Sequence, residues 1–565
     1  MERSLGAQSL RSVRAYVESG TPYVWLTAAA IATCVIVVAA LLLLIASRGM
    51  PYFWPADVVV ASYLEPHKPA VPVMAEIVET EAVTTARLRS AGLNVSEAQS
   101  HYDRLLLKVG NRDKYGADFR FLLGDFLTDR KYPDDVLVLE RMEWGNFYGT
   151  PVAVKQAGAV VASGSEAWAA WQPLQARANE LRAKVRKIER GEIGTVNYRL
   201  EKQRLARRTL ELAGRTPQSD PAPYAALDAE RKELDARYTE LQAELAKLYE
   251  EETRDSLIMK TVEGEEVEIP LAKIVRGYQP NAMGVAGKLG FYAVKVWDFL
   301  TEDPREANTE GGIFPAIFGT VLMVLLMSII VTPLGVVAAV YMREYARQGL
   351  MTRIIRIAVN NLAGVPSIVF GMFGLGFFVY FVGGSLDALF FPEALPSPVF
   401  GTPGILWASL TLSLLTLPVV IVATEEGLAR IPRSLREASL ALGATKAETL
   451  WRVVIPMASP AMMTGLILAV ARAAGEVAPL MLVGVVKLAP SLPLDANLPF
   501  LHLERKFMHL GFHIYDVGFQ SPNVEAARPL VYATALLLVL VIVLLNLAAI
   551  RIRNKLRERY KALEH

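Results

Sequence analysis

The sequence has a single cysteine, few histidines and no phosphate-binding loop for nucleotides. Its 565 residues include one cysteine, Cys34, and six histidines. A lone cysteine cannot form an intramolecular disulfide, so no part of the chain is held together by one. No G-x-x-x-x-G-K-[ST] motif occurs, so any ATP hydrolysis must take place on another chain. No Ser/His/Asp or Cys/His arrangement stands out, so the sequence does not indicate an enzyme.

The chain also has little net charge. Lys and Arg number 59 against 57 Asp and Glu, which leaves +2 and suggests no nucleic-acid partner. Hydrophobic residues make up 53% and the mean hydropathy is +0.30. These values are high for a soluble protein and low for one made only of membrane spans. The composition therefore indicates a mixed chain, with membrane helices and a large polar domain.

Six apolar segments predict six transmembrane spans. They lie at about 23–46, 314–342, 358–382, 404–424, 460–486 and 529–550. The first carries no charge and is long enough to cross a bilayer, whereas a cleaved signal peptide has a shorter apolar core. An even number of spans places both termini on one side of the membrane.

Basic residues predict which side this is. They gather in the loop after span two, in the loop at 425–460 after span four, and in the tail at 551–565 (Arg343, Arg347, Arg353, Arg356; Arg430, Arg433, Arg436, Lys446, Arg452; Arg551, Arg553, Lys555, Arg557, Arg559, Lys561). The loop at 383–403 has no Lys or Arg. We therefore expect a cytoplasmic N-terminus (1–22), loop and tail in a bacterial inner membrane, with residues 47–313 in the periplasm.

The segment 47–313 reads as an inserted α+β domain. Short β-like runs separated by turn residues fill about 58–163, and a further β region follows at 256–280. Between them, at about 165–255, apolar residues alternate in steps of three and four on both sides of a Pro/Gly-rich break at 214–223. This pattern predicts an antiparallel coiled-coil hairpin. Glycines at 191 and 194 interrupt its heptad phase, which predicts a stutter or kink.

A charged stretch between two apolar segments carries the most specific motif. Its residues are Glu437, Ala438, Ser439, Gly443, Val453, Ile455 and Pro456. It resembles the coupling-loop signature of ABC importer permeases, E-A-A, then G, then I-x-L-P, at the same spacing. A serine replaces the third position, and the two aliphatic residues differ. In that family the loop docks into a groove on an ATPase subunit; the alternative is an ordinary amphipathic loop.

The fifth apolar segment contains two charges, Arg472 and Glu476. A charge at mid-membrane costs roughly 3 kcal/mol, so it faces the bundle interior and needs a partner. Four residues apart on a helix, the two side chains share one face. Arg presents a planar fork of donors that suits oxyanions. The pair predicts an anion path or gate, and the alternative is an ion pair that only locks two helices.

The same segment extends the resemblance. R-A-A-G-E-V-A-P-L at 472–480 is similar to the R-x-x-G-E-T-A-P-L element of the A-type permease of phosphate-specific ABC importers, with Val477 in place of threonine. The stretches 309–320, 333–345, 364–374 and 519–522 also look like that family. The resemblance covers Thr309 to the end and loosely span one. It implies a mainly α, six-helix type I ABC importer fold in a long form, and nothing carries over onto the insert.

Two further groups have open interpretations. Pro366 frees a backbone carbonyl and Ser367 offers a hydroxyl, so both are candidates either for the substrate path or for packing. His502, His509 and His513 cluster in one loop, and the last two have helical spacing that suits a metal. No carboxylate or cysteine completes a ligand set in the sequence, so we expect solvated surface histidines and no metal.

The resemblance implies a permease subunit for inorganic phosphate that works by alternating access. Its expected partners are a homologous permease, a dimer of ATPase subunits that uses ATP and Mg, and a periplasmic phosphate-binding protein. The chain itself would bind no cofactor. Two alternatives remain: a permease for another oxyanion such as sulfate or molybdate, and a membrane-anchored scaffold or sensor with a periplasmic arm.

Overall fold

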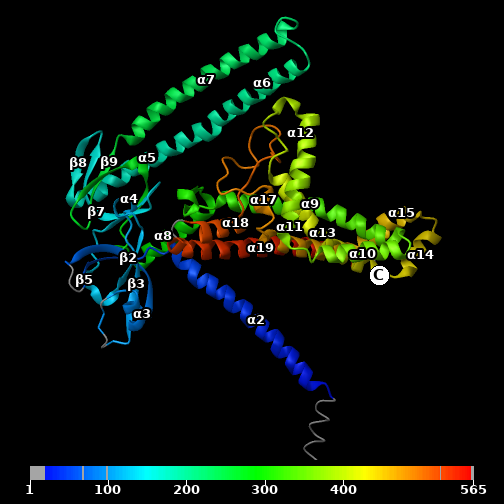
Figure 1. The fold of residues 1–565 in the computed structure, drawn as a ribbon, viewed down its shortest axis with the longest axis horizontal. Coiled ribbons are helices and arrows are strands. Elements are labelled where there is room, and N and C mark those ends of the chain that lie inside the picture. The colour runs from blue at the N-terminus through cyan, green and yellow to red at the C-terminus, as the bar shows by residue number, and fades with distance from the viewer. Residues whose placement is uncertain (1–18, 66–68, 94, 97–98, 522–523, 562–565) are drawn as a thin grey trace, which may run out of the picture.

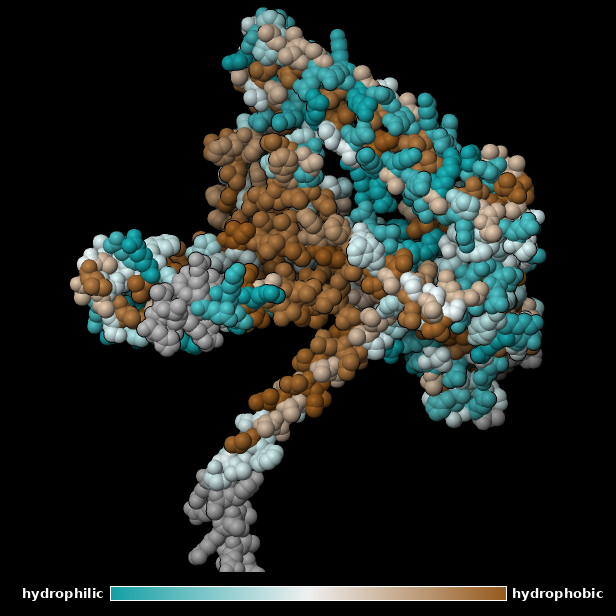
Figure 2. Space-filling model, turned by 180° about the vertical axis from the view of Figure 1, so that it is seen from behind, coloured by the Kyte–Doolittle hydropathy of each residue, from teal (hydrophilic) through white to brown (hydrophobic). Residues whose placement is uncertain are grey.

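The chain folds into three parts in the computed structural model, which describes residues 19–65, 69–93, 95–96, 99–521 and 524–561. They are a bundle of apolar helices, a β-rich insert, and a long two-helix arm that rises from the insert (Figure 1). The bundle surface is mostly hydrophobic, whereas the insert and the arm are mostly hydrophilic (Figure 2). Most of the expected cytoplasmic N-terminus (1–18) and the last residues of the expected cytoplasmic tail (562–565) lie outside the described residues.

Six helical segments in the described residues are long and apolar enough to cross a membrane, which confirms the predicted number. They are Thr21–Phe53, Phe314–Tyr345, Ser367–Phe390, Ile405–Ala429, Lys446–Gly475 and Ala527–Lys555. Their main helices are α2 (Thr21–Gly49), α9 (Phe314–Val340), α11 (Ser367–Phe373), α13 (Ile405–Ala429), α16 (Ile455–Gly475) and α19 (Val524–Lys561). The mainly helical fold is thus confirmed, with a β-rich domain inserted between the first two spans.

Helix α13 is the centre of the bundle, packed between α9 and α16. Its hydroxyl groups find partners within the helix itself. Thr411, Ser413 and Thr416 are buried, and each donates to the carbonyl four residues earlier at 2.7 Å. Because these hydroxyls are satisfied internally, they can be buried against apolar neighbours at little cost.

Small residues let the neighbouring helices approach α13 closely. Gly335 of α9 lies against Val420, and Gly465 of α16 lies against Ala423. A side chain at either glycine would overlap α13, so each position requires the absence of one. These contacts also show that α16 and α13 run antiparallel, because Gly427 of α13 meets Ala461 of α16.

The third apolar segment, expected at 358–382, is not one unbroken helix. Helix α10 (Leu350–Leu362) ends before it, and α11 starts after Pro366. Proline lacks an N–H and disfavours the helical conformation of the residue before it, which ends α10 here. From Ser367 the chain stays helical through η8 (Gly374–Gly383) and α12 (Gly384–Phe390). The predicted start of this span is therefore wrong.

The fifth apolar segment, expected at 460–486, begins and ends earlier. Elements α15 (Lys446–Thr449), η10 (Leu450–Val454) and α16 form one continuous helical stretch. It ends at Gly475, the next residue is extended, and Pro479 precedes the short α17 (Leu480–Val483). Glycine and proline are the residues that most strongly break a helix, so the apolar run continues beyond the helix that it was expected to form.

Two antiparallel sheets form the insert. The first has the order β4-β3-β2-β1-β5, and the second has β10-β9-β7-β6-β11 with β8 beside β7. The bounds are β1 (Val58–Tyr63), β2 (Val71–Thr84), β3 (His101–Lys108), β4 (Phe119–Leu123), β5 (Leu127–Lys131), β6 (Leu137–Arg141), β7 (Asn146–Gln156), β8 (Ala159–Ser163), β9 (Ser256–Lys260), β10 (Glu266–Pro270) and β11 (Ile274–Tyr278). Strand β9, which follows the arm, pairs with β7, which precedes it.

The arm consists of α5 (Ala167–Lys187), η4 (Ile188–Ile193), α6 (Gly194–Leu212) and α7 (Pro221–Thr253). At its base, Trp171 and Ala178 of α5 pack on the second sheet. Further along, the two sides of the hairpin share an apolar core of Val185, Ile188, Val196, Leu234, Leu241 and Leu245. The predicted interruption of the first helix is the π-helical turn η4. Such turns arise where an extra residue is accommodated in a helix.

The arm leans back over loops at the insert end of the bundle. The Tyr198 hydroxyl donates to the carbonyl of Leu498, and its ring lies edge-on to His502 with centroids 6.3 Å apart. Helix α6 also contacts η9 (Pro392–Ala394), in the loop after α12. The arm therefore forms an arch over these loops (Figure 1).

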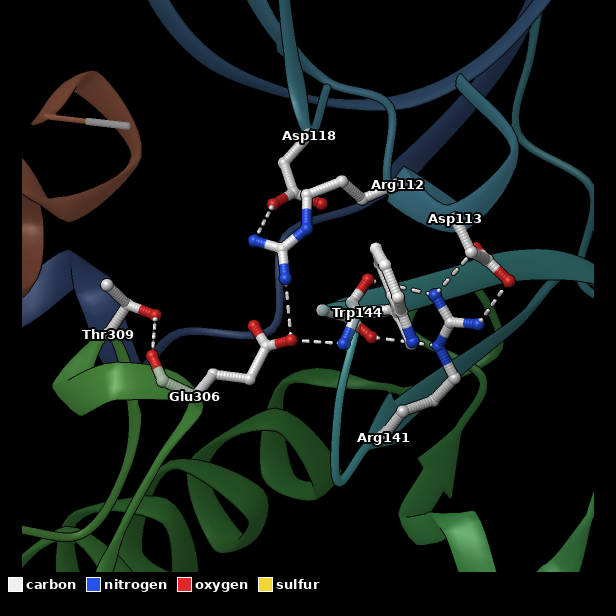
Figure 3. Close-up of polar contacts among 8 residues, drawn as sticks. Arg112, Asp113, Asp118, Arg141, Trp144, Glu306 and Thr309 are labelled. Atoms are coloured by element: carbon white, nitrogen blue, oxygen red, sulfur yellow. Dashed lines mark hydrogen bonds and ion pairs between the residues drawn. The ribbon is translucent and has the colours of Figure 1, made fainter. Parts of the chain in front are cut away.

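A polar contact joins the insert to the segment before span two. This segment contains β12 (Pro304–Arg305), η6 (Glu306–Asn308) and β13 (Glu310–Gly311). The Glu306 carboxylate pairs with Arg112 Nη2 at 2.6 Å and accepts the N–H of Trp144 (Figure 3). Arg112 also contacts Asp118 at 3.3 Å. The Glu306 side chain is 8% exposed, whereas Arg112 is 32% and Trp144 is 50% exposed, so water reaches the partners of the carboxylate.

We expect Glu306→Ala to loosen the insert. The change removes the acceptor of the Trp144 N–H and one of the two carboxylates that pair with Arg112, and because both groups are partly exposed the loss is about 1 kcal/mol. Faster proteolytic cleavage of the insert in native membranes would show this. The control is Glu233→Ala on the exposed face of α7. Equal cleavage rates of the two variants would contradict the prediction.

Candidate translocation site and coupling surface

Arg472 and Glu476 form the predicted pair at the end of α16. Arg472 Nε lies 3.6 Å from Glu476 Oε1, which is an ion-pair distance. The side chains are 36% and 20% exposed, so neither is sealed in the bundle. Glu476 is not part of the helix, because α16 ends at Gly475 and Glu476 has extended backbone angles. The two charges therefore meet across a helix end, not along one helical face as the spacing had suggested.

This helix end lies well inside the length of α13. Gly465 of α16 meets Ala423, and the two helices run antiparallel. About seven residues further along α16, Arg472 is level with the region of Thr416, since both helices rise by about 1.5 Å per residue. The charged pair is therefore level with the middle of the candidate span α13, and in a bilayer non-helical backbone at such a level is tolerated only inside protein or beside water.

The helical chain is interrupted a second time, at residues 363–366, beside the same part of α13. Before this interruption, Arg356 of α10 pairs with Glu425 of α13 at 2.5 Å. After it, Gly374 packs against Thr411 of α13. The non-helical residues 363–366 thus lie between these two levels. Ala363, Gly364 and Pro366 are exposed in this single chain, as is Gly475.

Residues that follow the two interruptions contact each other. Gly371 of α11 packs against Pro479, just after Glu476. No hydrogen bond or ion pair joins Ser367 to Arg472 or Glu476 among the described residues. At the start of α11 the N–H of Val369 donates to the carbonyl of Pro366, and this end of the helix carries a partial positive charge. A helix start and an arginine that both face one path would suit an anion.

The coupling motif folds into two short helices at the other end of the bundle. They are α14 (Arg433–Ala441) and α15, joined by Gly443 with φ of 90°. Glycine adopts this left-handed conformation without strain, which explains its place in the motif. The Ser439 hydroxyl lies 2.9 Å from that of Thr449, so the serine that departs from the family pattern ties α14 to α15.

The motif residues divide into exposed and packed positions. Glu437 and Ala438 are exposed on α14, whereas Val453, Ile455 and Pro456 are partly buried. Leu442 and Trp451, outside the quoted motif, are 89% and 72% exposed. Large exposed apolar side chains on a polar loop are a common sign of a protein interface.

Arg436 anchors this surface to the spans. Its guanidinium pairs with Glu344 Oε1 at 2.9 Å and donates to the carbonyls of Ile431 and Leu428. Glu344 belongs to η7 (Tyr341–Tyr345) at the end of span two, and Lys446 donates to its carbonyl. In the sequence, Arg436 indicated only which side of the membrane its loop occupies. The signal that was missed was Glu344, an acid among the basic residues after span two.

The three histidines are buried, which overturns the expectation of solvated surface positions. His502, His509 and His513 are 3%, 1% and 3% exposed. Burial lowers the pKa of His509 to about 3 and that of His513 to about 4, so both are neutral at physiological pH. His502 lies within hydrogen-bond distance of Asp495 and Glu504. No group of three or more His, Cys, Asp or Glu in the described residues could hold a metal ion.

Comparisons with known proteins give the family. Residues 331–561 match the family "Binding-protein-dependent transport system inner membrane component". The "Phosphate transport system permease protein PstA 1" of Mycobacterium tuberculosis (strain CDC 1551 / Oshkosh) is 36% identical over 275 residues, 47% of this chain and 79% of that protein. The "Probable ABC transporter permease protein YqgI" of Bacillus subtilis (strain 168) is 33% identical over 260 residues, 45% of this chain and 81% of that protein.

A solved inward-facing structure of the MetNI methionine ABC transporter covers 46% of this chain and 97% of its own at 20% identity, with a TM-score of 0.32. That superposition is too loose for a comparison of geometry. The two relatives, each matched over more than two thirds of its length, carry the assignment instead. Together with the family match, they show that the chain belongs to the binding-protein-dependent transport system inner membrane components, as an ABC permease of the PstA type.

Proposed function

We propose that this chain translocates inorganic phosphate across the inner membrane as one of two permease subunits of an ABC importer. The observation that carries the proposal is Arg472, held by Glu476 at a helix end inside the membrane. The similarity to proteins named as phosphate transport permeases supports phosphate as the substrate. Sulfate or molybdate would suit the same chemistry, and competition experiments distinguish them.

In this proposal the anion competes with Glu476 for Arg472. The guanidinium offers a fork of donors that matches a tetrahedral oxyanion, and the start of α11 adds partial positive charge. Ser367 and Pro366 would line the path beside them. When the anion leaves, Glu476 pairs with Arg472 again, so the guanidinium is never without a partner.

We expect Arg472→Ala to lower phosphate uptake about ten- to a hundredfold. Hydrogen bonds to a charged group contribute about 1.5–3 kcal/mol, and the variant removes them from the path. Radiolabelled uptake in cells with no other high-affinity phosphate system, at matched expression, measures this. Arg231→Ala on the exposed face of the arm serves as the control.

Three results of that experiment separate the alternatives. Loss of uptake in Arg472→Ala, with no competition by sulfate, supports both the site and the substrate. A wild type that carries sulfate but no phosphate would reject phosphate as the cargo. Normal transport by Arg472→Ala would mean that the ion pair is structural.

The energy for transport comes, in this proposal, from two ATPase subunits that bind ATP and Mg. They dock on the surface around Glu437, Ala438, Ser439 and Gly443. Leu442 would enter a groove on the ATPase, since it is the most exposed large apolar residue of the loop. Arg436 and Lys446 transmit the movement to the end of span two through Glu344. Movement of this kind rocks the bundle between inward and outward access.

We expect Leu442→Asp to weaken ATPase docking by about 2 kcal/mol, or about thirtyfold, because an interface anchor becomes a charge. The position is 89% exposed, so membrane insertion of the permease should be unaffected. Co-purification of the ATPase and phosphate uptake are the measurements. The matched control is Leu212→Asp, 51% exposed on the arm. Normal co-purification would remove Leu442 from the interface.

The topology that accompanies this proposal has both termini and the coupling loop in the cytoplasm and residues 47–313 in the periplasm. The basic residues near the coupling-loop end of the bundle support it. A binding protein would then deliver phosphate at the end of the bundle that carries the insert. There it would meet the arm, which arches over the loops at 392–394 and 498–502.

We propose that the arm is an antiparallel coiled coil that guides the binding protein. Leu234, Leu241 and Leu245 are spaced by seven and four residues and share one buried core, as in a heptad seam. The base of the arm belongs to the core of the insert through Trp171 and Ala178. A deletion that tests the arm must therefore spare its base.

We expect replacement of residues 194–233 by a short Gly/Ser loop to weaken binding-protein docking tenfold or more, a loss of about 1.4 kcal/mol. The change removes the Tyr198 contact with the loop at Leu498 but keeps Trp171 and Leu241 in place. Affinity of the purified binding protein for the reconstituted complex is the measurement. Unchanged affinity and unchanged assembly would reject this role for the arm.

A further inference from the structure

Helix α8 (Val285–Thr301) turns its charges towards the insert. Lys288 pairs with Asp57, Lys295 pairs with Glu140, and Asp298 pairs with Arg276. Lys288 is only 9% exposed although it is a lysine. Lys288, Lys295 and Asp298 follow one another at spacings of seven and three residues, so they share one face of the helix. That face is occupied by ion pairs within the same chain.

The opposite face of α8 is apolar and uncovered. Val285, Leu289, Val294 and Trp297 are 72%, 55%, 50% and 66% exposed. At about 100° per residue they lie within one half of the helix circumference, with Ala286, Gly290 and Ala293 between them, which are also exposed. In a domain surrounded by water, a helix normally turns its apolar side to the core and its charges to the solvent. Helix α8 has the opposite arrangement, with its charges towards the insert and its apolar side exposed. An exposed apolar face of this kind indicates a surface that contacts a membrane or another protein.

Aromatic contacts fix the position of α8 relative to span one. Phe53, which follows α2 within a few residues, packs against Phe299 and Tyr292 with ring centroids 5.1 and 6.0 Å apart. Trp54 lies 6.2 Å from Tyr292. Helix α8 is therefore held at the level where span one leaves the membrane, next to the end of the bundle (Figure 1). Tyr and Trp are enriched at this level in membrane proteins.

We propose that α8 lies in the plane of the lipid bilayer at the insert side and that its exposed face binds the membrane surface. Continuity with span one, the apolar face and the aromatic residues at its edge all favour lipid as the occupant. Helices of this kind bury their apolar face about 5–10 Å into the boundary between headgroups and acyl chains. Because Lys288 and Lys295 are engaged by carboxylates, binding rests on apolar area and not on anionic lipid.

Site-directed spin labelling of the assembled transporter tests this proposal. In a Cys34→Ser background, a nitroxide is placed at Leu289→Cys or Val294→Cys, both exposed positions. The control is Leu212→Cys on the arm, which is 51% exposed and lies in the hydrophilic part of the chain. The complex is reconstituted in vesicles of phosphatidylethanolamine and phosphatidylglycerol. A lipid labelled on its acyl chain gives the reference for the bilayer interior.

We expect both α8 labels to collide several-fold more with oxygen than with a water-soluble nickel chelate, as the labelled lipid does, and Leu212→Cys to show the reverse. Replacing phosphatidylglycerol with phosphatidylcholine should leave the ratio unchanged, since the α8 cations are already paired. Labels that the nickel chelate reaches as it reaches Leu212→Cys would show a water-facing helix and overturn the proposal. Labels shielded from both reagents would mean that another protein subunit covers the face, which also overturns it.

Discussion

The absence of water inside a bilayer is the constraint on which this structure depends. Every backbone polar group at that depth must find a partner in the protein, so the spans are helices. α13 satisfies even its hydroxyls by donating to its own carbonyls. Against this background, two interruptions stand out, at residues 363–366 and after Gly475. Both lie beside α13, and both adjoin residues that the sequence analysis had singled out.

Much of this could be predicted because the signals are local and strong. The apolar runs predict six spans, and the spacing of Glu437, Gly443 and Pro456 predicts the coupling loop. The helix breaks were missed because Pro366 and Gly475 lie within continuous apolar sequence. An apolar run reports burial in lipid or protein and does not report whether the backbone is helical. The fates of Pro333 and Pro418, which remain inside helices, show that a proline alone does not settle the matter.

Contacts between distant segments were beyond reach of the sequence. The histidines read as a polar surface cluster, because nothing nearby in the chain shows that the surrounding loops bury them. Arg436 and Glu344 are 92 residues apart, so their pairing depends on the packing of spans two and four. Helix α8 was overlooked since it is too short to span and its charges interrupt the apolar pattern. The ion pairs of Lys288 and Lys295 with the insert show which side of α8 is occupied and which side is exposed.

The insert is tied to the bundle at both of its ends, after span one through Phe53 and before span two through Glu306. Both spans are thus attached to the insert on that side. In the proposed mechanism, these two spans and the insert would stay fixed. Movement of the coupling loop would then be taken up by the remaining spans. Span three begins just after Pro366 and span five ends at Gly475, so in the proposed mechanism these two spans would move, and Arg472 would move with span five.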